Sequence, residues 1–212
     1  MHRLSLPQEF VLLLHRQEGS YYACDHTGAA ELAELLLTQR IQLADKKVSP
    51  LVHEPTAVAW VDDALSWLHR RGKPVAAATF IQSRTDARNQ HAESLLASGL
   101  MRREDKKFLF IPYRKYHPEP HTRQLLVERI RSSVRGMAAL DERMVLLCAL
   151  VHATGLAPKL GLDRQERARL KEISKGNELG TAVQDVTAAT VAAVTVAATA
   201  AAAAGGAAAG SS

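Results

Sequence analysis

The sequence predicts a mostly α-helical protein, in which a central hydrophobic helix is surrounded by amphipathic helices and accompanied by two short β-hairpins. Leu and Ala are abundant, while aromatic residues make up only 5% of the 212 residues, and this composition favours helices over sheets. Residues Met144 to Val151 are apolar on every face of a helix, so other elements must surround them. This stretch is too short to cross a bilayer.

The central helix is predicted between Asp141 and Leu156. The acidic pair Asp141 and Glu142 suits a helix start, and Gly155 followed by Pro158 suits a stop. Elsewhere the apolar residues recur along one helical stripe, as in a helix that packs one face on a core. Such amphipathic helices are predicted over residues 6–16, 27–40, 56–71, 74–81, 84–98, 126–137 and 163–175.

Two hairpins interrupt the helices. Residues 41–45 and 48–54 are short β-rich runs joined at Lys46 and Lys47, and Pro50 places the second run at a sheet edge. Residues 100–103 and 108–112 form the second predicted hairpin, with its turn at the charged residues 104–107. In its second strand, Phe108 and Phe110 share one face, so at least one of them is expected to point inward.

The C-terminal part of the chain changes composition to Ala, Val and Thr after Thr181. Val183, Val186, Thr190 and Val194 fall on one helical stripe, which predicts a helix packed on the domain. We therefore expect one domain over residues 1–204 and a low-complexity Ala/Gly/Ser tail over residues 205–212. A transmembrane anchor is not expected, because Ala contributes too little to insertion.

The charge and the cysteines indicate the partner and the compartment. The formal net charge is +5, yet residues 100–135 alone hold ten Lys or Arg against four Asp or Glu, a local charge of +6. Such a concentrated basic region predicts an anionic partner, a phosphoinositide-bearing membrane or a nucleic acid, although a solvated basic face remains an alternative. Cys24 and Cys148 have no motif spacing, and no signal peptide is recognisable, so a cytoplasmic location is expected.

Sequence motifs for catalysis are missing. There is no phosphate-binding Gly-rich loop, CxxC pair, HExxH or GxSxG, so we expect neither an enzyme nor a cofactor. His117 and His121 are four residues apart, but Pro118 and Pro120 prevent the helix that would aim both at one metal ion, and no metal is expected. His152 is interpreted as a satisfied histidine in the core or at a helix end.

The candidate binding residues are basic. On a helix over residues 84–98, Arg84 and Arg88 would be neighbours, and two guanidinium groups side by side can hold one phosphate. The alternative is two solvated arginines, one of them paired with Asp86 or another nearby acid. The second hairpin would lie beside them and face the membrane. Its expected membrane-facing residues are Arg102, Arg103, Lys106, Lys107, Phe108 and Phe110.

The order of these elements resembles the Golgi phosphoprotein 3 family over nearly the whole chain. The resemblance is carried by FVLLL followed by a turn at Glu18-Gly19 and by the segments LAELLLTQRIQL, WVDDALSWL, HAESLLASGL, KKFLFIP, YHP, RQLLVERIRSSVRG and DERMVLLCALVHATGL. It implies the mostly helical fold with a membrane-facing hairpin and peripheral binding to phosphatidylinositol 4-phosphate. For eukaryotic members it also implies retention of Golgi glycosyltransferases, hence client membrane proteins.

This sequence departs from the eukaryotic pattern at the lipid pocket. Residues 19–28, which correspond to the loop before the second helix, contain neither the family's Trp nor its Arg. Of two further basic positions, Arg88 matches one, Thr85 stands at the other, and Arg84 is one position away. The basic N-terminal arm is absent as well, and the short form with its Ala-rich tail resembles the bacterial branch, to which a Golgi role does not apply.

The leading hypothesis is thus a non-enzymatic peripheral membrane protein that binds anionic phosphoinositide-type headgroups. The alternative is a winged-helix-like nucleic-acid-binding protein, because a helix followed by a basic hairpin is typical of that motif. A small enzyme acting on lipid or sugar precursors is a third reading, which rests only on the family's link to glycosylation. The hairpin at residues 100–112 could also join two protomers into a homo-oligomer.

Overall fold

The structure is a computed structural model that describes residues 4–175 together with 191, 192, 194 and 195. Its helices and strands follow one another as α1 (Leu6–Leu14), α2 (Thr27–Leu37), β1 (Ile41–Ala44), β2 (Lys47–Pro50), α3 (Ala59–Arg71), β3 (Val75–Ala76), α4 (Ala77–Ser83), α5 (Ala87–Ala97), β4 (Met101–Phe108), β5 (Ile111–Pro118), α6 (Pro120–Val134), α7 (Glu142–Ala153), a 3₁₀ turn η1 (Ala157–Leu160) and α8 (Arg164–Ile173). The mostly helical fold with short hairpins is confirmed.

The central hydrophobic helix is α7, which is buried at every position from Arg143 to Val151. The Asp141 carboxylate caps its start by accepting the backbone N–H of Met144 at 2.7 Å. Helix α7 packs against α1, α2, α6 and α8. An apolar helix enclosed in this way has its hydrophobic surface removed from water on every side.

Helix α1 lies at the centre of the molecule together with α7. The sequence predicted an amphipathic helix there, with one face packed on the core. Its leucines and Phe10 are fully buried, because α2, α5, α6 and α7 contact it from different directions. Glu9 is buried with them, and its carboxylate lies 2.6 Å from Arg129 and 3.3 Å from Arg143. An ion-paired glutamate can occupy a core position that an unpaired one could not.

The first hairpin is confirmed and gains a third strand, so β2 lies in the middle of the sheet, and the edge position predicted from Pro50 is wrong. Strands β1 and β2 pair antiparallel, and β3 adds to β2 through Val48 opposite Val75. The helix predicted from residue 74 therefore begins only at Ala77. Val75 has the β-branched side chain that suits a strand, and its pairing with β2 outweighs the helical pattern that follows it.

The second hairpin forms, but the predicted position of its turn is wrong. Residues 104–107, expected as the turn, lie within β4 and pair with residues 112–115 of β5. The turn consists of Leu109 and Phe110, which both have positive φ angles, 46° and 76°. Opposite charges on neighbouring strands stabilise each other when paired, so the charged run forms strand rather than turn.

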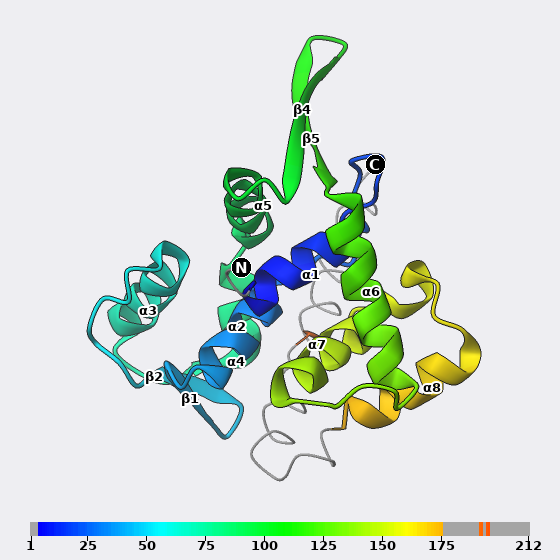
Figure 1. Cartoon of the computed structure of the whole chain (residues 1–212). Coiled ribbons are helices and arrows are strands. Elements are labelled where there is room, and N and C mark those ends of the chain that lie inside the picture. The colour runs from blue at the N-terminus through cyan, green and yellow to red at the C-terminus, as the bar shows by residue number, and fades with distance from the viewer. Residues whose placement is uncertain (1–3, 176–190, 193, 196–212) are drawn as a thin grey trace, which may run out of the picture.

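The hairpin β4–β5 projects from the helical body beyond α5 and the start of α6, while α3 and the small sheet lie at another end of the molecule (Figure 1). Gly19 allows the loop after α1 to approach the base of the hairpin: a Cβ there would lie 2.6 Å from a ring nitrogen of His117. Its φ of 82° is also one that glycine adopts most easily. The hairpin base is thereby fixed against the helices.

Among the described residues, no helix is long and apolar enough to span a membrane. The helix predicted after residue 181 lies largely outside the described residues, as does the whole tail from 205 to 212. Of the predicted helix, residues 191, 192, 194 and 195 are described as helical, and Val194 is buried.

Candidate functional site

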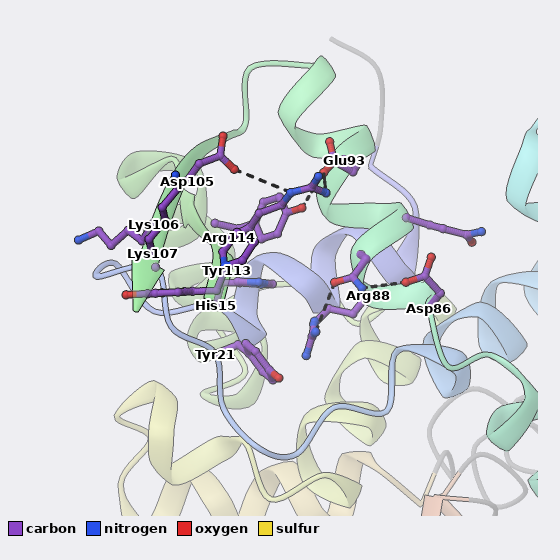
Figure 2. Close-up of a pocket in the computed structure, with 15 residues that line it drawn as sticks. His15, Tyr21, Asp86, Arg88, Glu93, Asp105, Lys106, Lys107, Tyr113 and Arg114 are labelled. Atoms are coloured by element: carbon purple, nitrogen blue, oxygen red, sulfur yellow. Dashed lines mark hydrogen bonds and ion pairs between the residues drawn. The ribbon is translucent and has the colours of Figure 1, made fainter. Parts of the chain in front are cut away.

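A cleft of about 900 Å³ separates the first turns of α5 from the side of the β4–β5 hairpin (Figure 2). Helix α5 contributes one wall, the hairpin contributes the other, and the loop after α1 closes the base with Tyr21. The lining residues include Tyr21, Asp86, Arg88, Asn89, Glu93, Lys106, Lys107, Tyr113 and Arg114. Segments about 90 residues apart in the sequence thus meet at one site, which therefore depends on the tertiary fold.

Arg88 is the arginine of α5 that lines this cleft. Its guanidinium carbon lies 3.7 Å from the centre of the Tyr21 ring, a cation–π contact. Asp25 holds the same guanidinium at 3.3 Å, and 20% of the Arg88 side chain remains exposed. Stacking fixes the plane of the guanidinium while leaving part of its edge available to an anion.

Arg84 and Arg88 do not share a helix, because α5 begins at Ala87 and Arg84 is the C-cap residue of α4. The prediction of two arginines one turn apart on a single helix is therefore wrong. Arg84 is only 7% exposed and donates to Glu31 and to Asp63, each at 2.6 Å. Since two carboxylates already compensate its charge and it does not line the cleft, the structure gives it a structural role.

Of the basic hairpin residues, Lys106, Lys107 and Arg114 line the cleft, and the basic residues differ in their ion pairs. Arg114 lies 3.8 Å from both Glu93 and Asp105. Arg103 lies 3.8 Å from Glu93, and Lys106 is 3.2 Å from Glu104. Lys107 is exposed and forms no ion pair with any residue that the structure describes. Arg102 lies apart from this cleft, in a smaller hollow beside His117.

The tip of the hairpin is apolar and exposed. Leu109, Phe110 and Ile111 have 75%, 96% and 67% of their surface exposed. Phe108 pairs with Ile111 at the end of β4, and its side chain lies outside the described part of the structure. Two-residue turns with positive φ angles favour Asn and Gly, so Leu and Phe at these positions cost free energy. Apolar residues kept in such a conformation suggest a contact outside the chain.

The base of the cleft contains two buried rings, His15 and Tyr116, beside the exposed ring of Tyr21. His15 is almost fully buried, and its ring lies 5.9 Å from that of Tyr21 and 6.0 Å from that of Tyr116. Burial lowers the pKa of His15 to about 4, and the nearby charge of Arg88 adds to the shift. The Tyr116 hydroxyl donates to Glu93 at 2.6 Å, and burial with this hydrogen bond raises its pKa. These groups remain uncharged at neutral pH.

Tyr21, Asp25 and Arg114 contribute to the site, although no sequence pattern predicted them as site residues. Tyr21 lies in a loop, and a loop has no helical or strand periodicity from which the direction of its side chain could be predicted. An aromatic pair, Tyr21-Tyr22, in an otherwise polar loop was the available signal, since exposed aromatic residues on loops are often contact residues. No comparable signal marked Asp25 or Arg114.

The described part of the chain offers no metal centre, because it contains no group of three or more His, Cys, Asp or Glu side chains that could hold an ion. His117 contacts the Gln17 carbonyl oxygen at 2.9 Å and Glu104 at 3.0 Å, and His121 belongs to the first turn of α6.

Helix α5 offers a poor surface for DNA recognition. Its exposed positions are Asn89, Gln90, Ser94 and Ala97, and none of these residues is cationic.

The chain is similar to a known protein family. The model of a protein family, Golgi phosphoprotein 3 (GPP34), matches residues 6–190 and so covers most of the chain. None of the curated proteins matches it.

Proposed function

Because this chain belongs to the Golgi phosphoprotein 3 family, we propose that it is a non-enzymatic peripheral membrane protein that binds anionic phosphoinositide-type headgroups, phosphatidylinositol 4-phosphate among them. The observation that carries the proposal is the exposed apolar tip at the end of a basic hairpin, directly beside the cleft that holds Arg88. Apolar side chains that enter a bilayer next to cations that contact phosphates are the usual means of peripheral membrane binding.

Within the cleft, Arg88 is the proposed contact for the headgroup phosphate, supported by Lys107 and Arg114 from the hairpin. Tyr21 takes the place of the aromatic residue that the family resemblance implies, since it stacks on Arg88 at 3.7 Å. Arg84 supports the site indirectly, by holding the chain just before α5 through Glu31. Arg88 shares its charge with Asp25, so a phosphate must compete with that carboxylate.

At the tip, Phe110 is the proposed membrane anchor, together with its neighbours Leu109 and Ile111. Burying one large apolar side chain in the bilayer contributes about 1.5–3 kcal/mol. Arg103, Lys106 and Lys107 would then stand at the level of the headgroups, where each adds about 1 kcal/mol on an anionic surface. In this proposal the protein acts at the cytoplasmic face of a membrane, where client membrane proteins or a second protomer could join it.

Vesicle sedimentation tests the proposal. The Arg88→Ala variant should bind vesicles containing phosphatidylinositol 4-phosphate about tenfold or more weakly than wild type, because it loses a charge-assisted contact of about 1.5–3 kcal/mol. A matched control, Lys73→Ala, removes an exposed positive charge beside β3 and should bind as wild type does.

The melting temperature of Arg88→Ala must be close to that of wild type for the comparison to hold. Equal vesicle binding by the two proteins would reject the assignment of Arg88. If wild type ignores anionic vesicles and instead shifts duplex DNA, the nucleic-acid alternative replaces the lipid proposal.

A further inference from the structure

A second basic cleft, of about 710 Å³, lies on the other side of the loop that follows α1. Three elements distant in sequence meet there: this loop, the first turns of α6 and the 3₁₀ turn η1. Each contributes one cation, namely Arg16, Arg123 and Lys159. Convergence of three positive charges from separate elements is not explained by the amphipathic pattern of any one of them.

Tyr22 forms the platform of this second cleft. The guanidinium carbon of Arg16 lies 4.4 Å from the centre of the Tyr22 ring, and the Lys159 ammonium nitrogen lies 5.2 Å from the same centre. The Tyr22 hydroxyl donates to the Lys159 carbonyl oxygen at 3.0 Å and so ties the loop to η1. Cation–π contacts hold both cations near the ring without neutralising their charge.

Arg123 supplies the third cation and is half-buried. Its Nε–H donates to the His15 carbonyl oxygen at 3.0 Å, which leaves the two terminal nitrogens of the guanidinium for other partners. Burial lowers the pKa of Arg123, as expected for a cation that has lost water without gaining a close carboxylate.

The charges in this cleft are less compensated than those in the first. Among the described residues, neither Arg123 nor Lys159 forms an ion pair, and the lone acidic side chain in the lining is Glu18, 3.6 Å from Arg16. In the first cleft, by contrast, Arg88 and Arg114 are both paired with carboxylates. An anion would therefore displace fewer existing contacts in the second cleft.

We propose that Arg16, Arg123 and Lys159 form a second anion site that binds a phosphate monoester. Three cations converging on one space suit a dianionic phosphate, which offers several acceptor oxygens and accepts from guanidinium and ammonium groups at once. Two sources would supply this chemistry: the phosphorylated headgroup of a membrane lipid, or a soluble phosphate ester.

The two clefts share the loop that separates them. Tyr21 stacks on Arg88 in the first and the adjacent Tyr22 contacts Arg16 and Lys159 in the second, because successive side chains of an extended backbone point to opposite sides. Both clefts also adjoin the projecting hairpin: Lys106 and Tyr113 of the hairpin line the first, and Pro120, where α6 follows β5, lines the second. A phosphate in the second cleft would therefore order the loop that also carries Tyr21.

Amide chemical shifts of the labelled full chain can follow each cleft separately. In a titration with inositol 1,4-bisphosphate, the amides of Gln17, Tyr22 and Gln124 should shift and report the second cleft, while Asn89 and Gln90 report the first. In the double variant Arg16→Ala with Lys159→Ala, the dissociation constant at the second cleft should rise about tenfold or more. Both side chains are exposed, so this variant should fold.

The matched control, Lys47→Ala with Lys73→Ala, removes two exposed charges at the small sheet and should leave these shifts unchanged. Vesicles containing phosphatidylinositol 4-phosphate separate the sources: weaker binding by the double variant identifies a lipid headgroup, and unchanged vesicle binding with lost shifts identifies a soluble ester. The absence of shifts at Gln17, Tyr22 and Gln124 in wild type, or shifts that persist in the double variant, would overturn the proposal. Neither result depends on Arg88.

Discussion

At the scale of single residues, Glu31 fixes the start of the helix that carries the proposed headgroup contact. Its side chain is fully buried on α2, accepts from Arg84 at 2.6 Å and lies 2.9 Å from a ring nitrogen of His91 on α5. One carboxylate thus ties α2 to residues on both sides of the α5 N-terminus. Arg88 lies within this span, so its position depends on Glu31.

Replacing Glu31 should destabilise the protein strongly. Glu31→Ala leaves Arg84 buried with only the exposed carboxylate of Asp63, and breaking a buried ion pair in this way costs about 3–5 kcal/mol. Asp63→Ala, which removes the exposed partner of the same arginine, should cost about 1 kcal/mol or less. Chemical denaturation of the two variants compares the values directly, and equal losses would contradict the assigned role of Glu31.

His15 should make the stability depend on pH. Its pKa is about 4 in the folded protein, against an ordinary 6.5, because burial disfavours the charged ring. Below pH 6.5 the unfolded chain therefore binds a proton that the folded one does not. The contribution of His15 to the free energy of unfolding should be constant above pH 6.5. It should fall by about 3 kcal/mol as the pH is lowered to 4.

A non-titrating variant isolates this contribution. His15→Gln should be less stable at pH 7, through lost packing, yet should lose less stability than wild type between pH 6.5 and 4. The pKa values of His26 and His152 are lowered by burial too, and they give both proteins the same residual slope. Denaturation curves at several pH values provide the test, and parallel slopes for the two proteins would show that His15 does not titrate as described.

At the scale of elements, the β4–β5 hairpin combines a stable base with a costly tip. Its eight cross-strand pairs run from Met101 opposite Pro118 to Phe108 opposite Ile111. The base packs on α5 through Tyr116 and on the α1 loop through His117. The turn, by contrast, places Leu109 and Phe110 at positive φ angles in water. Stability alone would not select these residues there.

Exchanging the turn residues should separate stability from membrane binding. The double variant Leu109→Asn with Phe110→Gly supplies the sequence that a turn with two positive φ angles favours, so its melting temperature should equal or exceed that of wild type. Its binding to anionic vesicles should weaken at least tenfold, because the apolar tip is gone. Met137→Asn, which removes another exposed apolar side chain after α6, is the control and should bind normally. Undiminished binding by the turn variant would exclude the tip as the anchor.

At the scale of the whole molecule, the placement of charge matters more than its sum. The net charge is only +5, and the small sheet at the far end of the molecule carries cations as well, Lys47 and Lys73 among them. If the hairpin faces the membrane, only charges near it lie within the Debye length of the lipid surface, about 8 Å at physiological salt.

Charge reversal at the two ends should therefore have unequal effects. Lys106→Glu with Lys107→Glu should weaken binding to anionic vesicles by about 1 kcal/mol or more per residue, whereas Lys47→Glu with Lys73→Glu should have little effect. The difference should shrink as the salt concentration rises, and neutral vesicles should bind wild type poorly. Equal losses from both pairs would indicate that net charge, rather than orientation, drives association.

The sequence by itself determined the fold class, the central position of α7 and the basic character of residues 100–135. These properties depend on periodicity and composition, which act locally and can be read along the chain. It also indicated the family, through the order of its elements. The match to residues 6–190 confirms that assignment.

Only the tertiary structure decided how the basic residues are used. The sequence placed both Arg84 and Arg88 among the candidate binding residues. The carboxylate of Glu31, 53 residues away from Arg84, compensates the charge of Arg84, whereas Arg88 stacks on Tyr21 and lines the cleft. The hairpin turn moved to Leu109 and Phe110 because cross-strand pairing of charges outweighs the preference of polar residues for turns. The free energy of a side chain depends on its burial and its partners, and for these residues the partners come from distant parts of the chain.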